Sequence, residues 1–183
     1  MIFYKNGFHP LVIWFTGYSG AGKSTLASGL ENELNSMGYP VRILDGDDLR
    51  KGLNSDLGFD LHSREENIRR AAEVAKIIRE SGLICLSCFI TPTEALREKV
   101  RGIIGMQYLV EIFVNAPLMV CEERDVKGLY RKARSGAIQE FTGISSPFEI
   151  PIAPDIEVRP DLDTVEDCVE QCLALILPRI QRG

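Results

Sequence analysis

A glycine-rich run that ends in a lysine and a serine is the first place where the sequence predicts chemistry. Residues 17–24 have the sequence GYSGAGKS, which fits the phosphate-loop pattern G-x-x-x-x-G-K-[ST] in full. Glycines let such a backbone point its N–H groups at phosphate oxygens, and the following helix presents its positive end to the same anion. The Lys23 ammonium would neutralise the β- and γ-phosphates, and the Ser24 hydroxyl would help to hold Mg²⁺. The expected ATP-binding residues are Gly17, Tyr18, Ser19, Gly20, Ala21, Gly22, Lys23, Ser24 and Thr25.

Two carboxylates, Asp45 and Asp47, follow the second apolar run and are candidates for work on the acceptor. Strand ends of an α/β sheet line the ligand crevice, where a carboxylate can accept a hydroxyl proton or hold Mg²⁺ through water. The alternative is a turn whose acids cap the next helix. We favour the functional interpretation because the third apolar run ends in Ser87, Cys88 and Phe89, without an acidic residue for the usual metal ligand.

A cluster of cationic side chains surrounds an aromatic residue further along the chain. Its members are Arg50, Phe59, Arg64, Asn67, Arg69 and Arg70. Arginine can grip a phosphate or sulfate in a bidentate manner, and an aromatic face can stack on a base. For Arg69 and Arg70 taken alone, a solvated helix face with Glu–Arg pairs is the better interpretation.

A later segment is a candidate lid. Its cations are Lys127, Arg131, Lys132 and Arg134, close to Gly128 and Gly136. A hinged lid that closes cations over a transferring phosphoryl group would have this composition. An exposed basic loop would have it too, and the residues alone leave both interpretations open.

The elements that must position these residues follow from apolar periodicity. Short apolar runs rich in β-formers predict strands at 11–16, 41–44, 83–89 and 109–114. Helical spacing predicts helices at 23–37, 64–81, 92–104 and 117–124. A last helix carries Val165, Cys168, Val169, Cys172, Leu173 and Ile176 on one stripe.

Strands that alternate with helices imply an α/β protein, of the P-loop NTPase-type three-layer α/β/α kind with a mainly parallel central sheet. The helix at 23–37 is expected to bury Leu26, Leu30, Leu34 and Met37. Segment 127–154 has weak periodicity, so we expect it to be lid-like or irregular.

The composition is that of one globular domain and disfavours two kinds of partner. The chain has 183 residues, 45% of them hydrophobic and 26% charged, so one globular domain over 1–183 is expected. Its phosphate loop makes this single domain a candidate P-loop kinase domain. The net charge of −5 disfavours nucleic-acid binding through bulk charge. No apolar run approaches the ~20 residues of a membrane span, and residues 1–10 lack the pattern of a secretory leader.

The cysteines are expected to be reduced and structural. Five is an odd number in a chain of ordinary size, which favours a cytoplasmic location. Cys85 and Cys88 have a metal-ligand spacing, but residues three apart on a strand point to opposite faces. Cys168 and Cys172 lie on the apolar stripe of the last helix and are expected in the core. We therefore expect no zinc site.

A series of short runs between residues 14 and 154 goes beyond a generic phosphate loop. The runs are DGDDLR at 45–50, GLN at 52–54, DLGF at 56–59, REENIRR at 64–70, FITP at 89–92, CEERD at 121–125, KGLY at 127–130, KAR at 132–134 and FTGI at 141–144. Together they resemble the adenylyl-sulfate kinase (APS kinase) family of P-loop kinases. The resemblance implies that ATP and adenylyl sulfate give ADP and 3′-phosphoadenylyl sulfate, with Mg²⁺ as cofactor and the ribose 3′-hydroxyl as acceptor.

The resemblance also implies roles for particular residues. Asp47 becomes the candidate proton acceptor or, through a water, a Mg²⁺ ligand, with Asp45 beside it. Phe59 and Phe141 would sandwich the adenine of adenylyl sulfate, the arginines would hold its phosphosulfate, and Arg124 is a candidate for the adenine of ATP. The implied substrate-binding residues are Asp47, Asp48, Leu49, Arg50, Phe59, Arg64, Asn67, Ile90, Thr91, Lys127 and Phe141.

Thr91 is where the chain departs from the family pattern. Many family members carry a serine there, which has been assigned as a phosphoenzyme position. Threonine also has a hydroxyl, so Thr91 is a candidate for the same role. Direct in-line transfer requires no enzyme nucleophile and is the mechanism that we favour.

The resemblance further implies a homodimer and coupling, in sulfate assimilation, to a sulfate adenylyltransferase on a separate polypeptide. Two alternatives stay open. A P-loop kinase for another small acceptor, such as a sugar acid or a nucleoside, would share Lys23 and the acidic pair but would not explain Phe59, Arg64, Asn67 and Phe141. A non-catalytic nucleotide-sensing module is opposed by the intact phosphate loop and Asp47.

Overall fold

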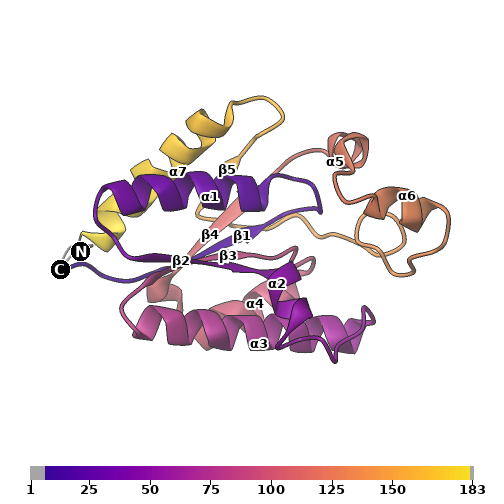
Figure 1. Cartoon of the computed structure of the whole chain (residues 1–183), viewed down its shortest axis with the longest axis horizontal. Helices are drawn as coiled ribbons and strands as arrows, with labels where there is room; N and C mark the ends of the chain where they lie inside the picture. Colours follow the sequence, from indigo (N-terminus) through magenta and orange to yellow (C-terminus); the bar gives the residue numbers. More distant parts are fainter. Residues whose placement is uncertain (1–6, 182–183) are drawn as a thin grey trace.

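Five parallel strands form one central sheet in the computed structural model, which describes residues 7–181 (Figure 1). The strands are β1 (Val12–Thr16), β2 (Val41–Asp45), β3 (Ile84–Cys88), β4 (Leu109–Val114) and β5 (Ile156–Val158). Their order is β2-β3-β1-β4-β5, so β3 lies between the first two strands of the chain. All four neighbouring pairs are parallel. The expected α/β class is confirmed, with a sheet that is parallel throughout.

Two layers of helices cover the sheet, as Figure 1 shows. Helices α1 (Lys23–Ser36) and α7 (Val165–Ile180) lie on one face, and α3 (Leu61–Glu80) and α4 (Glu94–Ile104) lie on the other. Alternation along β1 divides its side chains between the two layers: Ile13 joins the core under α1 and α7, whereas Trp14 joins the core over α3 and α4. Burial on both faces explains why the strands are continuous apolar runs in the sequence.

Short elements complete the fold. Helices α2 (Gly46–Lys51), α5 (Leu118–Arg124) and α6 (Leu129–Arg134) come after β2 or β4, at the end of the sheet where the strands terminate, whereas a 3-10 helix (Met106–Tyr108) comes directly before β4, where that strand begins. The sequence predicted four of the strands and the long helices, but not α2, α6 or β5. Helix α2 has no buried residue and therefore no apolar periodicity to reveal it. Helix α6 lies within the segment that was expected to be irregular.

Helix boundaries differ from the prediction where a polar cap decides them. Helix α3 begins at Leu61, three residues before the predicted start, because the Asp60 carboxylate accepts the Ser63 N–H. Helix α4 begins after Thr93, whose hydroxyl accepts the Leu96 N–H. Met37 was expected in the buried stripe, but it is the C-cap of α1 and is 39% exposed. That expectation is therefore wrong for Met37.

The cysteines occupy the core, as expected. All five are free and buried. Cys85 packs on the α3 and α4 side of the sheet and Cys88 on the α1 and α7 side, which confirms that the two thiols point to opposite faces. Among the described residues, no helix combines the length and apolar character needed to cross a membrane.

Leu30 tests the contribution of the core between α1 and the sheet. It is 1% exposed, so Leu30→Ala should leave a cavity and lower the free energy of unfolding by about 3 kcal/mol. Met37→Ala, at the exposed end of the same helix, should change it by less than ~1 kcal/mol. Urea unfolding of both variants measures the difference, and equal losses would contradict this description of the core.

Candidate active site

A large cavity of about 890 Å³ opens where β1, β2 and β3 end. Its position matches the rule that ligands of open α/β sheets bind beyond the carboxyl ends of the strands. It brings together most of the residues that the sequence singled out: Ser19, Gly20, Gly22, Lys23, Ser24, Thr25, Asp45, Asp47, Arg50, Phe59, Arg64, Asn67, Ile90, Thr91, Lys127 and Phe141. Six other predicted residues are not on its wall in the described structure: Gly17, Tyr18, Ala21, Asp48, Leu49 and Arg124.

The phosphate loop connects β1 to α1 and depends on its first glycine. Gly17 has φ of 149°, and a Cβ there would lie 2.5 Å from the Val114 carbonyl oxygen, so a side chain would displace the loop from β4. Helix α1 begins at Lys23, directly after Gly22, so its unpaired N–H groups face the cavity side of the loop. The loop therefore has the geometry of an anion site.

The side chain of Lys23 folds back onto the phosphate loop. Its ammonium donates to the carbonyl oxygens of Gly17 at 2.9 Å and Tyr18 at 2.7 Å. Burial lowers the pKa of Lys23 to about 8. A phosphate placed in the loop would supply the negative charge that this buried cation lacks, and would raise its pKa again.

Asp45 connects the phosphate loop to the second strand. Its Oδ2 accepts the Ser24 hydroxyl at 2.7 Å, and its Oδ1 accepts the Asp47 N–H at 2.9 Å as the N-cap of α2. The capping interpretation and the functional interpretation of the acidic pair thus both apply to this one carboxylate. The sequence ranked Asp47 ahead of Asp45 as the Mg²⁺ ligand, whereas the structure places Asp45 against the serine.

Lys127 reaches the acidic pair from the opposite side of the cavity. Its ammonium forms an ion pair with Asp47 Oδ2, and both side chains are more than half exposed. Residue 127 begins the segment that the sequence marked as a candidate lid. The contact shows that a cation of this segment can approach the carboxylate at the start of α2.

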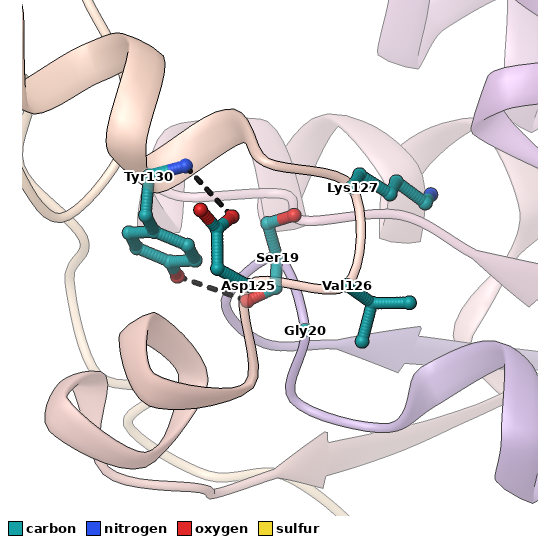
Figure 2. A pocket seen from close by; sticks show the side chains of 6 residues that line it. All are labelled: Ser19, Gly20, Asp125, Val126, Lys127 and Tyr130. Carbon is teal, nitrogen blue, oxygen red and sulfur yellow. Dashed lines mark hydrogen bonds between the residues drawn. The ribbon is translucent and has the colours of Figure 1, made fainter.

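The start of the candidate lid is hydrogen-bonded to the phosphate loop (Figure 2). The Asp125 carboxylate accepts the N–H groups of Tyr130 at 2.9 Å and Arg131 at 3.1 Å, which caps α6. The Tyr130 hydroxyl donates to the Ser19 carbonyl oxygen at 2.9 Å. Burial raises the pKa of Tyr130, so its phenol stays a donor. In Figure 2 the Lys127 side chain points away from Tyr130.

Two arginines on the acceptor side of the cavity lack a carboxylate partner. Arg50 Nη1 donates to the carbonyl oxygens of Leu57 and Gly58, both at 3.2 Å, and its guanidinium lies 4.3 Å from the centre of the Phe59 ring. Arg64 Nε donates to the Phe59 carbonyl oxygen at 2.7 Å, and Nη1 to the Thr142 hydroxyl at 2.9 Å. Burial lowers the pKa of both guanidinium groups.

Arg50 and Arg64 form no ion pair among residues 7–181, in contrast to two other arginines of α3. Arg69 and Arg70 both pair with Glu66, at 2.7 and 2.8 Å, as the alternative of a solvated helix face predicted. Because both guanidinium groups are partly buried and form hydrogen bonds to neutral acceptors only, an anionic ligand between Arg50 and Arg64 would be favourable.

Phe59 and Phe141 line the same cavity from different segments. Phe59 is exposed, whereas Phe141 is buried and packs edge-on against Tyr130 with ring centroids 5.0 Å apart. Asn67 lies nearby in α3, and its Oδ1 accepts the Asn54 side-chain amide at 2.9 Å. The adenine sandwich implied by the resemblance stays a prediction.

Two of the predicted residues outside the cavity wall have polar partners elsewhere in the structure. Asp48 forms an exposed ion pair with Lys51 at 2.7 Å. Arg124 donates to the carbonyl oxygens of Gly20 at 3.4 Å and Pro160 at 3.0 Å, so it lies beside the phosphate loop. Its contact with the adenine of ATP stays a prediction.

Thr91 is fully buried, although its segment contributes to the cavity wall. Its hydroxyl accepts the Trp14 indole N–H at 2.8 Å, and its φ of 43° is in the left-handed region that β-branched residues rarely adopt. A phosphoryl group on this oxygen would have to displace the indole. The geometry therefore favours direct transfer over a phosphoenzyme.

Sequence reasoning missed several residues that build the site. The Trp14 indole donates a hydrogen bond to the Thr91 hydroxyl, and the Tyr130 hydroxyl donates one to the phosphate loop. The Thr142 hydroxyl accepts one from Arg64. Thr142 and Tyr130 belong to runs that carry the family resemblance, which is the one signal that pointed to them. Trp14 appeared only as part of an apolar strand.

Comparisons with known proteins agree with this geometry. Residues 9–159 match the family model described as adenylylsulphate kinase. The adenylyl-sulfate kinase of Geotalea daltonii is 52% identical over 175 residues, which cover 96% of this chain and 86% of that protein. The solved Mycobacterium tuberculosis APS kinase in complex with AMPPNP and APS aligns with a TM-score of 0.88 and 40% identity, covering 92% of this chain and 98% of that one.

A more distant kinase shares the fold alone. The gluconokinase of Sinorhizobium meliloti aligns with a TM-score of 0.60, but only 16% of its residues are identical. The alignment covers 95% of each chain. Because the family model spans most of the chain and relatives of about half identity align along nearly all of it, this chain belongs to the adenylyl-sulfate kinase family of P-loop kinases.

Proposed function

We propose that the chain transfers the γ-phosphoryl group of ATP to the ribose 3′-hydroxyl of adenylyl sulfate, giving ADP and 3′-phosphoadenylyl sulfate. The observation that carries this proposal is a single cavity that joins a phosphate loop to two unpaired arginines beside Phe59. The loop fits a nucleoside triphosphate, and the arginines fit an anion attached to a planar base. Membership of the adenylyl-sulfate kinase family supports the same reaction.

The donor side binds and polarises the triphosphate. Backbone N–H groups of residues 17–24 and the N-terminus of α1 surround the β-phosphate. Lys23, released from the Gly17 and Tyr18 carbonyl oxygens, places its charge on the phosphates. Because phosphoryl transfer depends mainly on positioning and charge neutralisation, these groups account for most of the catalysis.

The residues around Ser24 fit a magnesium ion. The Ser24 hydroxyl and the Asp45 carboxylate, 2.7 Å apart, are hard oxygen donors of the kind that Mg²⁺ prefers, and Asp47 adds a carboxylate that can act through water. Within the described part of the chain no group of three or more His, Cys, Asp or Glu residues is gathered for a metal, so substrate phosphates would complete the coordination. When bound, Mg²⁺ supplies further neutralisation of phosphate charge.

On the acceptor side, Arg50 and Arg64 bind the phosphosulfate, and Phe59 and Phe141 bind the base. Asp47 then accepts the proton of the attacking 3′-hydroxyl. Lys127 forms an ion pair with Asp47, so its ammonium lies beside the carboxylate that would accept the proton and close enough to neutralise charge on the transferring phosphoryl group. No covalent enzyme intermediate is required.

The remaining partners follow from the chemistry of the substrate and from the family. Adenylyl sulfate must come from an enzyme that joins sulfate to an adenylyl group, so we propose a separate sulfate adenylyltransferase as the functional partner. A homodimer is proposed from family membership. Five free, buried thiols support a reducing, cytoplasmic compartment.

An acceptor panel tests the proposed reaction. ADP release is measured with Mg²⁺ and ATP in the presence of adenylyl sulfate, gluconate, shikimate or adenosine, or with no acceptor. Turnover should be confined to adenylyl sulfate, and Lys23→Ala should reduce kcat by at least 10²-fold, of the order seen when one oxyanion donor is removed.

Two results of this panel would contradict the proposal. Preference for gluconate, shikimate or adenosine would assign the cavity to another acceptor. ATP binding without turnover on any acceptor would indicate a nucleotide-sensing module. Wild-type activity in Lys23→Ala would contradict only the role given to this lysine.

Arg64→Ala tests the acceptor side. Loss of an unpaired cation that faces the phosphosulfate should raise KM for adenylyl sulfate by roughly 10- to 100-fold, the range expected for hydrogen bonds to charged groups. KM for ATP should change little. Arg69→Ala on the same helix is the matched control, since Arg69 pairs with Glu66. Equal rises in both KM values for Arg64→Ala would show that the acceptor site lies elsewhere.

Thr91→Val tests the phosphoenzyme while keeping a β-branched side chain at this position. We expect kcat to be retained within about threefold, because in-line transfer does not use the buried hydroxyl. The free energy of unfolding should fall by ~1–3 kcal/mol, because the Trp14 N–H loses its acceptor. Loss of turnover in a folded Thr91→Val protein, or a phosphothreonine found by mass spectrometry after incubation with ATP, would restore the covalent route.

A further inference from the structure

A buried arginine lies directly behind the acceptor side of the cavity. Arg97 of α4 is 1% exposed, and its guanidinium donates in three directions. Nε donates to Glu94 Oε2 at 2.8 Å, Nη1 to the Thr91 carbonyl oxygen at 2.9 Å, and Nη2 to the Glu149 carbonyl oxygen at 2.8 Å. Two of its three acceptors are therefore backbone atoms that belong to other segments.

The first of these segments is the turn after β3 that forms part of the cavity wall. Ile90 and Thr91 line the cavity, and Thr91 has the unfavourable φ of 43°. Such a conformation persists only where surrounding contacts determine it. Arg97 supplies one of these contacts from behind, and the Thr16 hydroxyl, which donates to the Ile90 carbonyl oxygen at 2.6 Å, supplies another.

The second segment is the end of the candidate lid, where the chain returns to the sheet. Besides the bond to Arg97, Glu149 accepts the Glu94 N–H through Oε2 at 2.7 Å, and its own N–H donates to the Pro92 carbonyl oxygen at 2.8 Å. Arg97 thus sets the position of residue 149 relative to residue 91. This point lies close in sequence to Phe141 and Thr142, which carry the lid side of the acceptor cavity.

A neighbouring arginine takes part in the same charge network without touching the cavity wall. Arg101 pairs with Glu94 and, at 2.6 Å, with Glu111 of β4. Burial acts to raise the pKa of Glu94, and the two arginines more than offset it, so its pKa lies below the usual value. Arg101 shares the Glu94 carboxylate with Arg97 but does not bind the backbone of residue 91 or residue 149, which makes it a matched control.

We propose that Arg97 is a positioning residue of the acceptor site: its guanidinium joins the Ile90–Thr91 wall to the return of the lid at Glu149, and so sets the affinity for adenylyl sulfate without touching either substrate. The inference rests on the proposed function. A buried ionic network contributes little net stability compared with apolar packing, so its stability alone does not explain an arginine with two backbone acceptors. The fork geometry of guanidinium explains it, because one group can bridge several acceptors.

The experiment compares Arg97→Lys with Arg101→Lys. Each variant keeps the positive charge beside Glu94, but an ammonium cannot reproduce the planar fork that Arg97 uses. Arg97→Lys should raise KM for adenylyl sulfate about tenfold, equivalent to ~1.4 kcal/mol, and leave KM for ATP within about twofold. Arg101→Lys should leave both KM values within about twofold, even where its melting temperature falls as much as that of Arg97→Lys.

The possible outcomes are distinct. An unchanged KM for adenylyl sulfate in Arg97→Lys, or the same selective rise in Arg101→Lys, would overturn the positioning role. If Arg97→Lys does not fold, Glu94→Gln replaces it as the test, because it weakens the hydrogen bond at Arg97 Nε and leaves the arginine in place. Glu94→Gln must then raise KM for adenylyl sulfate selectively, and unchanged KM values would overturn the proposal. If the wild-type protein turns over adenylyl sulfate and Arg97→Lys has an unchanged KM for it, only this inference is refuted. If the wild-type protein shows no turnover, the proposed function is refuted as well.

Discussion

The hydrogen bond from Ser24 to Asp45 is the interaction on which the site depends. Ser24 is the last residue of the phosphate loop and lies in the first turn of α1, and Asp45 ends β2, yet β3 separates β2 from β1 in the sheet. The bond therefore passes over the end of β3, which terminates in Cys88 and offers no carboxylate of its own. Because Asp45 also caps α2, the same side chain that faces the donor phosphates orients the helix that carries Asp47 and Arg50 toward the acceptor.

The segment that contributes Lys127 and Phe141 to the cavity wall is joined to the rest of the site near both of its ends. At its start, Asp125 and Tyr130 tie it to the phosphate loop. At its end, Arg97 and Glu94 hold Glu149 against the turn after β3. This one segment therefore connects the phosphate loop on the donor side to the turn after β3 on the acceptor side.

The sequence was most informative where backbone chemistry demands particular residue types. The phosphate loop located Lys23 and Ser24, and continuous apolar runs located the buried strands. Elements without apolar periodicity were not predicted: α2 is a six-residue helix with no buried side chain, and β5 has only three residues. Residue type pointed to Phe59 and Arg64, and the family resemblance added Phe141, which lines the same cavity although it lies far from the other two in the chain.

The buried hydrogen bonds that support the cavity wall could not be predicted from residue type. Arg97 has the sequence context of an ordinary polar helix face, and only the tertiary fold shows that it is buried against two backbone carbonyl oxygens. Asp48 is the opposite case: it belongs to the run at 45–50 that resembles the family, but its side chain forms an ion pair with Lys51 on the surface. The sequence therefore identified residues that line the cavity better than the residues that hold them in place.

Trp14 is the one tryptophan of the chain, and its place in the structure makes it a built-in optical probe. Its indole stacks on Phe89 with ring centroids 4.9 Å apart, and its N–H is bound to Thr91 at the edge of the acceptor cavity. Indole emission responds to changes in hydrogen bonding and in nearby charge. The intrinsic fluorescence of the unlabelled protein consequently reports on one side of the active site alone, free of background from any other tryptophan.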